Sequence, residues 1–402
     1  MKYDFVVLGA DGIQGLIVTK DLLQRGYSIL VADIYKTKIG KLLDEFKNSN
    51  VVFKYIDLRD IEQTKKLLKQ SKADIVINCA DMWWNINVYK ACVANKMHCV
   101  DLGSWIEATS QQLRMDKEFK KINRTAITGC GSVPGIGNVM LNYASDKFDS
   151  LTSINAGFSW DSNMEKWVVP FSMKSILEEF TCEPRLVENG KWVKRKPLEI
   201  VHEKDYRGIG MQKCFLVQHP ELLTFYHYFK NKGLKTVRFF GGYPEHSLEK
   251  ICSLIDMGFH SDKPLKIDGL KIAPLDVLAP VLKKLNSPKG YKEQENLWVD
   301  INGIKDGKPK NILMECIVPP VKGWYDSGCN IDTGFPAVIM AEMIKDGRIT
   351  SPGSFAPEAI VPIQEFFDEL KKRNFVVYEN GKSINTGGRN VLIDPLKKIK
   401  SC

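Results

Sequence analysis

Three glycines stand three residues apart near the start of the chain, Gly9, Gly12 and Gly15, directly after the apolar run Phe5–Leu8. Glycine inside a helix or strand costs about 0.5–1 kcal/mol relative to alanine, so this spacing indicates a backbone function that side chains would block. In a loop between a strand and a helix, Gly9 permits a tight turn, Gly12 lets the backbone approach a pyrophosphate, and Gly15 lets the helix pack closely. The helix N-terminus adds unpaired N–H groups and a positive dipole end, so the loop predicts a phosphate cradle.

The glycine spacing is G-x-x-G-x-x-G rather than the commoner G-x-G-x-x-G, because Asp11 and Gln14 stand where that pattern has glycine. In this respect the loop resembles that of the extended short-chain reductases. We expect the following loop residues to contact a dinucleotide: Gly9, Asp11, Gly12, Ile13, Gln14 and Gly15.

The second predicted strand ends in Asp33, 24 residues after Gly9. A carboxylate at this position accepts hydrogen bonds from both ribose hydroxyls and repels a 2′-phosphate, which favours NAD. Lys36 and Lys38 follow closely and could instead meet a 2′-phosphate, so NADP remains the alternative.

The ends of the third and fourth predicted strands supply further cofactor contacts. Asp57 could accept from the adenine amino group while Leu58 packs on the ring, although Asp57 also suits the N-cap of the following helix. Small residues after the fourth strand would leave room for the nicotinamide half of the cofactor, and they are Asn78, Cys79 and Ala80.

A second glycine-rich turn, Gly129–Gly135, follows the sixth predicted strand and precedes the predicted helix Asn138–Tyr143. Its N–H groups, including that of Gly131, could hold a substrate carboxylate or the nicotinamide amide. A purely structural turn is the alternative.

Short apolar segments alternate with amphipathic ones over the first 130 residues, which predicts a parallel sheet with helices on both faces, a Rossmann-type doubly wound α/β fold. Ligands bind such sheets beyond the carboxyl ends of the strands. The predicted strands are Tyr3–Leu8, Ser28–Ala32, Val51–Tyr55, Ile75–Cys79, His98–Leu102 and Thr125–Thr128, and the predicted helices are Gln14–Gln24, Lys36–Phe46, Ile61–Lys69 and Trp84–Val93.

After about residue 145 the chain becomes richer in strands, and Leu297–Ile304 with Asn311–Ile317 predicts an antiparallel hairpin. Helices return with Pro336–Lys345 and Pro357–Arg373. We therefore expect a discontinuous dinucleotide-binding domain, residues 1–145 and 334–402, interrupted by an α+β domain for substrate binding and dimerisation, residues 146–333.

Composition narrows the functional class. The chain has 402 residues and a net charge of +9, but its lysines are dispersed, which argues against nucleic-acid binding. No run of 18 apolar residues predicts a membrane span, and the first apolar run is too short for a signal peptide. Ten cysteines without C-x-x-C pairs favour a reduced, cytoplasmic setting without a metal site.

The segment Gly129–Asn138, GCGSVPGIGN, resembles the C-G-x-x-P-G-x-x-N motif of the saccharopine dehydrogenase-like family, which includes lysine 6-dehydrogenases, saccharopine reductases and carboxynorspermidine dehydrogenases. His98–Leu102 is similar to the H-Y-V-D-L strand of this family, and Lys235–Phe239 to the K-T-L-R-Y segment of its lysine dehydrogenases. The resemblance spans residues 3 to 375. It implies hydride transfer between a nicotinamide and a carbon bearing nitrogen, with lysine or saccharopine as the expected substrate type, and a homodimer.

This chemistry requires a group that exchanges protons with an amine. Asp101, at the end of the fifth predicted strand, is the first candidate for that base and for cofactor contact, although it could instead cap the turn that follows it. Glu178 and Glu179 are the second choices, and at least one of them suits a helix surface. Arg238 is the candidate for binding a substrate carboxylate, because arginine binds carboxylates through two parallel hydrogen bonds, and a surface or interface arginine is the alternative. The alternative function is a catalytically inactive dinucleotide-binding sensor.

Overall fold

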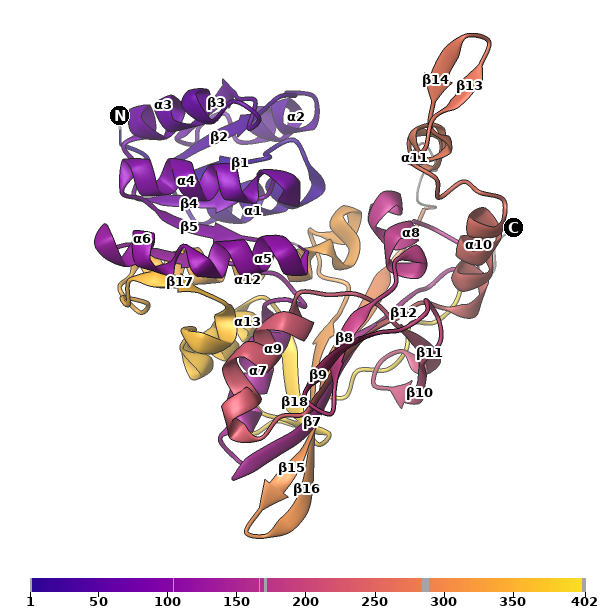
Figure 1. Cartoon of the computed structure of the whole chain (residues 1–402). Helices are drawn as coiled ribbons and strands as arrows, with labels where there is room; N and C mark the ends of the chain where they lie inside the picture. The colour runs from indigo at the N-terminus through magenta and orange to yellow at the C-terminus, as the bar shows by residue number, and fades with distance from the viewer. Residues whose placement is uncertain (1, 104, 166, 170–171, 284–288, 400–402) are drawn as a thin grey trace.

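Two β-sheets, one parallel and one mostly antiparallel, lie on either side of a shared hydrophobic core in the computed structural model (Figure 1). The structure describes every residue except 1, 104, 166, 170–171, 284–288 and 400–402. Within these described ranges, no helix is both long and apolar enough to cross a bilayer.

The first sheet contains seven parallel strands in the order β17-β6-β5-β4-β1-β2-β3. The predicted strands are present with ends shifted by up to two residues, and the order reverses between β1 and β4, where doubly wound folds bind dinucleotides. Strand β17 was not predicted, because it has only three residues. The bounds are β1 Phe5–Leu8, β2 Ile29–Asp33, β3 Val51–Tyr55, β4 Ile75–Asn78, β5 His98–Asp101, β6 Thr125–Ile127 and β17 Gly353–Phe355.

Helices cover both faces of this sheet, which confirms the doubly wound α/β prediction. Side chains alternate along β1, so Phe5 and Val7 belong to one hydrophobic cluster with α1 and α12, while Val6 and Leu8 belong to another with α3 and α4. The helices of this part are α1 Ile13–Gln24, α2 Lys38–Glu45, α3 Ile61–Ser71, α4 Asn85–Asn95, α5 Ile106–Arg114, α6 Asp116–Lys121 and α12 Ile331–Lys345. Two further helices, α7 Ile136–Ser145 and α13 Ile363–Lys372, contact strands of the second sheet.

The second sheet follows the order β10-β11-β12-β7-β15-β16-β18-β19, with β8 and β9 attached to β12. The predicted hairpin is confirmed, since β15 and β16 pair antiparallel and close at Lys305 and Lys308. The strands are β7 Ser150–Ser162, β8 Arg185–Glu188, β9 Lys191–Lys194, β10 Val201–Tyr206, β11 Gly210–Leu216, β12 Thr236–Gly242, β15 Glu293–Lys305, β16 Lys308–Val318, β18 Val376–Glu379 and β19 Lys382–Ser383.

The segment after residue 334 contributes to both sheets. Strand β17 joins the parallel sheet beside β6, whereas β18 pairs with β16 in the second sheet. The domain limits given above therefore stay a prediction. The long helix predicted over Pro357–Arg373 begins only at Ile363, because Pro362 disfavours helical backbone at the residue before it.

The remaining helices lie on the second sheet and beside it, and a small hairpin projects from the body of the molecule (Figure 1). The sequence also predicts a helix over Pro274–Leu285, and α11 begins at Pro274 as expected, but residues 284 and 285 lie outside the described residues. The bounds are α8 Met173–Thr181, α9 Glu221–Phe229, α10 Glu245–Asp256, α11 Pro274–Lys283, β13 Leu265–Ile267 and β14 Leu270–Ile272.

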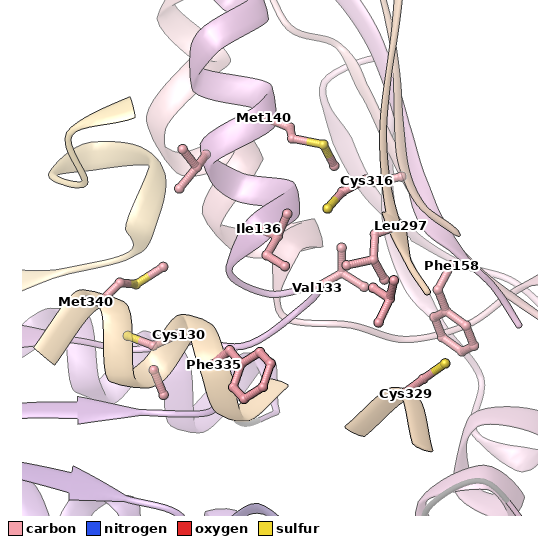
Figure 2. Packing of buried hydrophobic residues seen from close by; sticks show 14 of the residues in the cluster. Cys130, Val133, Ile136, Met140, Phe158, Leu297, Cys316, Cys329, Phe335 and Met340 are labelled. Carbon is pink, nitrogen blue, oxygen red and sulfur yellow. The ribbon is translucent and has the colours of Figure 1, made fainter. Parts of the chain in front are cut away.

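The two sheets are joined by continuous apolar packing around the second glycine-rich turn. Figure 2 shows Val133 of that turn beside Leu297 of β15, with Ile136 of α7 above it and Phe158 of β7 close by. Burying side chains of this size stabilises the fold by roughly 1.5–3 kcal/mol each. The turn is thus anchored in the core that fixes one sheet against the other.

Candidate functional site

A cleft of about 590 Å³ opens beyond the carboxyl ends of β1, β2, β3 and β4, and we call it the dinucleotide cleft. Its size lies within the usual range of small-molecule sites. Predicted cofactor residues that line it are Gly9, Asp11, Gly12, Ile13, Asp33, Asp57, Leu58, Cys79 and Ala80, and it is completed by Ile34, Tyr35, Lys38, Ile56, Arg59, Asp81 and Trp84.

The glycine loop has the close contacts that a phosphate cradle requires. A Cβ on Gly9, where φ is +72°, would lie 2.5 Å from the backbone nitrogen of Ala80, and a Cβ on Gly15 would lie 2.1 Å from the carbonyl oxygen of Gly9. A Cβ on Gly12 would contact only that same oxygen, at 3.3 Å. The open space beside Gly12 at the start of α1, where helix N–H groups lack intrahelical partners, fits a pyrophosphate.

Asp33 and Asp11 are tied to the surrounding backbone. Asp33 accepts hydrogen bonds from the backbone N–H of Asp11 at 2.9 Å and of Tyr35 at 2.9 Å. Asp11 in turn accepts from the backbone N–H of Lys38 at 2.6 Å and of Ile39 at 2.8 Å at the start of α2. These bonds hold the glycine loop, the end of β2 and α2 together around the cleft.

Asp57 does not cap a helix, because the N-cap of α3 is Asp60, which accepts from the backbone N–H of Glu62 and Gln63. Instead, the guanidinium of Arg59 donates to Asp57 at 2.6 Å, and this bond holds the pKa of the Asp57 carboxyl below its usual range. The carboxylate therefore stays charged at the rim of the cleft.

Asn78 is buried and does not line the cleft, contrary to our prediction. Its amide donates to Asn85 at 2.8 Å and its oxygen accepts from the backbone N–H of Ala80 at 3.3 Å. It therefore shapes the turn whose residues Cys79 and Ala80 do line the cleft.

A second, smaller cavity of about 200 Å³ lies between the two sheets, and we call it the acidic pocket. Gln14, on the first turn of α1, lines it, so the pocket adjoins the glycine loop. The side-chain oxygen of Gln14 is buried without a hydrogen-bond partner among the described residues. The other lining residues are Ser132, Val133, Phe158, Trp160, Glu179, His219, Glu293, Glu295, Cys329, Asn330, Asp332 and Thr333.

Four carboxylates converge on this pocket from three elements. Glu293 and Glu295 are two residues apart on β15 and so point to the same face of the sheet, Asp332 lies in the first turn of α12, and Glu179 lies on α8. Burial raises the pKa of Glu295 and Asp332, and the charge of Asp332 raises that of Glu295 further. A nearby cation would favour their ionised forms.

Glu293 is held firmly at the base of the pocket. It accepts from the hydroxyl of Tyr291 at 2.6 Å and from the backbone N–H of Cys329 at 2.7 Å. A Cβ on Gly328 would lie 2.1 Å from one of its oxygens, so glycine is required beside it.

Glu179 is the pocket carboxylate suited to exchange protons near neutral pH, and His219 lines the pocket with it. Burial raises the pKa of Glu179 to about 7, although the charge of His219 and a 3.0 Å hydrogen bond from the Tyr243 hydroxyl partly oppose the rise. A group with a pKa near the working pH is an effective general acid and base. Glu179 is one of the two second choices predicted from the sequence, whereas His219 was not predicted.

The structure does not support Asp101 as the base or as a cofactor contact. It is fully buried and lines neither cleft. One oxygen accepts from the Tyr89 hydroxyl at 2.8 Å and from the Gln112 amide at 2.7 Å, and the other from the backbone N–H of Gly103 at 2.8 Å. Asp101 therefore joins α4, α5 and the end of β5.

Arg238 also lies away from the acidic pocket. Its guanidinium donates to Glu188 at 2.8 Å on one face of β12, while the next residue, Phe239, stacks on His219 with ring centroids 4.0 Å apart. Side chains alternate along a strand, so Arg238 points away from the face that supports the pocket.

The backbone of the second glycine-rich turn is already committed. The N–H of Gly131 donates to the carbonyl of Pro134 at 2.8 Å, and the N–H of Gly135 donates to the Asn138 side chain at 2.8 Å. The N–H of Gly131 is therefore not available to a ligand, and the turn contributes instead the side chains of Ser132 and Val133 to the acidic pocket.

Comparison with known families gives two adjoining matches. The model described as the saccharopine dehydrogenase NADP binding domain matches residues 5–127. The model described as the saccharopine dehydrogenase C-terminal domain matches residues 131–376.

Two curated proteins are similar over most of their length. Carboxynorspermidine synthase from Vibrio cholerae is 26% identical over 387 residues, which cover 88% of this chain and 92% of the relative. Carboxyaminopropylagmatine dehydrogenase from Synechocystis is 25% identical over 376 residues, which cover 89% of this chain and 92% of the relative.

Among solved structures, the apo saccharopine dehydrogenase (L-Glu forming) from Saccharomyces cerevisiae superposes with a TM-score of 0.74. The match covers 95% of this chain and 100% of that one at 16% sequence identity. At this identity the superposition establishes a shared fold.

Proposed function

This chain belongs to the saccharopine dehydrogenase family, and on that premise we propose that its substrate is a carboxylated polyamine whose cationic nitrogen binds in the acidic pocket. The family assignment makes the chain an NAD(P)-dependent amine or amino-acid dehydrogenase. The narrower statement about the substrate rests on the chemistry of the pocket.

The observation that carries this proposal is the charge of the pocket lining. Four carboxylates and one histidine line it, and no lysine or arginine is among its described lining residues. Such a lining attracts ammonium groups and repels carboxylates. A substrate with several amino groups and one carboxylate gains more from it than saccharopine, which carries three carboxylates and two amines, or lysine, which carries only two amines.

The names of the two relatives agree with this choice, since each denotes a polyamine derivative bearing a carboxyl group. The names describe those proteins, and the lining of the acidic pocket is the reason to extend the substrate class to this chain. The substrate carboxyl group would then lie outside the cluster formed by Glu293, Glu295 and Asp332.

The dinucleotide cleft would hold the cofactor through the glycine loop and Asp33, and a bound nicotinamide supplies hydride acceptance or donation. Among the chain's own residues, Glu179 takes the proton from the amine nitrogen, because only a neutral amine can lose hydride from its neighbouring carbon. The other pocket carboxylates bind the remaining ammonium groups and orient the substrate.

NAD is the preferred cofactor in this proposal, with NADP as the second choice. The carboxylate of Asp33 lines the cleft and would repel a 2′-phosphate. Lys38 lines the same cleft, whereas the ammonium of Lys36 lies 5.5 Å over the ring of Phe53.

We also propose a cytoplasmic homodimer. The projecting hairpin exposes 55% of Leu265 and 63% of Leu270, and exposed apolar surface of this kind commonly marks a contact with another molecule. The cysteines within the described ranges are free thiols, which suits a reducing compartment.

The substrate proposal is tested by following reduced nicotinamide while the protein oxidises carboxynorspermidine, saccharopine or lysine. We expect kcat/KM for carboxynorspermidine to exceed that for either amino acid by at least about 100-fold, which corresponds to about 2.7 kcal/mol. Faster oxidation of saccharopine or lysine would reject the polyamine assignment and leave the family assignment intact.

A further inference from the structure

His219 and Glu221 form a buried imidazole–carboxylate pair at the edge of the acidic pocket. The ring nitrogen Nδ1 of His219 lies 2.5 Å from an oxygen of Glu221. Glu221 is fully buried at the start of α9, whereas the side chain of His219 keeps 19% of its surface exposed and lines the pocket. The pair therefore has one buried member and one member that reaches the site.

The orientation of the His219 ring is fixed on two sides. The ring stacks on Phe239 with centroids 4.0 Å apart and planes 8° from parallel, and Phe239 is itself fully buried in β12. Because the bond to Glu221 occupies Nδ1, the opposite nitrogen, Nε2, is the one available to substrate. A carboxylate on one nitrogen selects the tautomer in which the other nitrogen is the acceptor.

The proposed reaction has two stages that exchange protons. In the first, the amine nitrogen loses a proton and the neighbouring carbon loses hydride to the nicotinamide, which leaves a carbon–nitrogen double bond. In the second, a water oxygen bonds to that carbon, the carbon–nitrogen bond breaks, and both water protons end on the departing amine. Glu179 suits the first stage because a carboxylate attracts an ammonium group. While it holds the amine proton it cannot accept one from water, so the second stage needs another carrier.

We propose that His219 is the catalytic residue of the second stage, accepting each water proton at Nε2 and returning it to the leaving nitrogen, and that Glu221 is its positioning residue. This inference rests on the proposed function. In the reverse direction the same transfers release water from the carbonyl and amine before hydride addition.

Other charged groups around the pair have different surroundings. Glu358 lies behind Glu221 and its carboxylate accepts from the Asn138 amide at 2.6 Å, so it is committed to the core. Glu179 lies near His219 on α8, and the charge of the imidazole acts to lower the pKa of Glu179. His219 therefore has two carboxylate neighbours: Glu179 in the pocket and the buried Glu221 behind it.

Rapid mixing of the protein with NAD and carboxynorspermidine tests the role of His219. In His219→Asn we expect a burst of reduced nicotinamide equal to the concentration of sites, followed by turnover slowed at least about 100-fold, the scale of lost general acid–base catalysis. Glu179→Gln should lack the burst. The exposed His227 on α9 provides the matched control, and His227→Asn should behave as wild type.

Loss of the burst in His219→Asn, or unchanged turnover, would overturn the assignment. If the wild-type protein does not reduce NAD with carboxynorspermidine, the proposed function fails, and that failure is seen before any variant is compared.

The ¹⁵N resonances of the imidazole test the role of Glu221 without substrate or cofactor. We expect His219 to carry its proton on Nδ1 in the wild type and in Glu221→Gln, whose amide oxygen can still accept, and to become a tautomer mixture in Glu221→Ala. Turnover in Glu221→Gln should likewise stay close to that of the wild type, and turnover in Glu221→Ala should be lower. A ring protonated on Nε2 in the wild type, or one tautomer in all three proteins, would overturn the positioning role even if Glu221→Ala proves unstable, because the wild type and Glu221→Gln remain to be compared.

Discussion

Gly12 and Gln14 are two residues apart at the start of α1, yet Gly12 lines the dinucleotide cleft and Gln14 lines the acidic pocket. The first turn of one helix therefore separates the proposed phosphate cradle from the proposed amine site. In the proposal the cofactor binds beside Gly12 and the substrate amine beside Gln14, so one turn of α1 would contact both.

The glycine loop can be tested with two alanine substitutions. Gly15→Ala places a Cβ 2.1 Å from the carbonyl oxygen of Gly9, so it should lower the free energy of unfolding by about 1–3 kcal/mol and abolish NAD binding. Gly40→Ala is the control, because its Cβ would lie 3.7 Å from the Lys36 side chain, and it should be neutral or slightly stabilising. Denaturant titration and fluorescence titration with reduced cofactor measure the two effects; normal cofactor affinity in Gly15→Ala would contradict the cradle.

Cofactor choice depends on Asp33. We expect the wild type to have a higher kcat/KM with NAD than with NADP, and Asp33→Ala to reduce this preference because the repulsion of a 2′-phosphate is removed. The variant also loses acceptors for two backbone N–H groups, so Asp33→Asn serves as the control that keeps an acceptor there. Equal use of both cofactors by the wild type would contradict the assignment.

Stability should depend on pH through Glu358. Burial raises the pKa of this carboxyl from 4.5 to about 7, so its contribution to stability is complete below about pH 4.5 and is lost as the pH rises through 7. At 1.36 kcal/mol per pKa unit, the loss is about 3 kcal/mol. Glu358→Gln keeps an acceptor for Asn138 without the charge, so its stability relative to wild type should increase between pH 5 and 8.

Denaturant unfolding of both proteins across this range measures the effect. Glu179 has a similarly raised pKa and titrates in both proteins, so the comparison isolates Glu358. Parallel stability curves for wild type and Glu358→Gln would show that Glu358 is ionised in the native protein at all of these pH values.

The projecting hairpin should carry the dimer contact. Sedimentation velocity at micromolar concentration should give a dimer for the wild type, and Leu270→Glu should shift it toward monomer because a charge replaces an apolar side chain that is 63% exposed in the single chain. The exposed Met211 on β11 offers a control, and Met211→Glu should remain dimeric. A monomeric wild type would contradict the dimer.

Much of the dinucleotide cleft could be predicted because one local rule applies to it. Parallel strands end at one edge, so Gly9, Asp33, Asp57 and Ala80 could be brought together from strand ends alone. The prediction that Asn78 contacts the cofactor was wrong, because Asn78 is the last residue inside β4 and its buried side chain donates to Asn85. A residue close to a strand end can therefore either line the cleft or lie buried in the protein.

The acidic pocket could not be assembled this way, since Glu179, His219, Glu293 and Asp332 come from distant segments and none belongs to a local motif. Reading strand ends in the second sheet as well would have drawn attention to His219, which follows β11 by three residues. Asp101 was misjudged because the helices that bury it carry its partners, Tyr89 and Gln112, and the sequence does not say which helix covers a strand end.

The most direct test of the central claim is calorimetric titration of carboxynorspermidine into the protein saturated with reduced cofactor. Wild type should bind it, and Glu295→Gln should bind it at least about 10-fold more weakly, the scale of one charged hydrogen bond of about 1.5 kcal/mol. Glu203→Gln, on the exposed surface of β10, is the control and should match wild type. Equal affinity of wild type and Glu295→Gln would contradict the account, because the acidic pocket would then not be the site that holds the cationic amine.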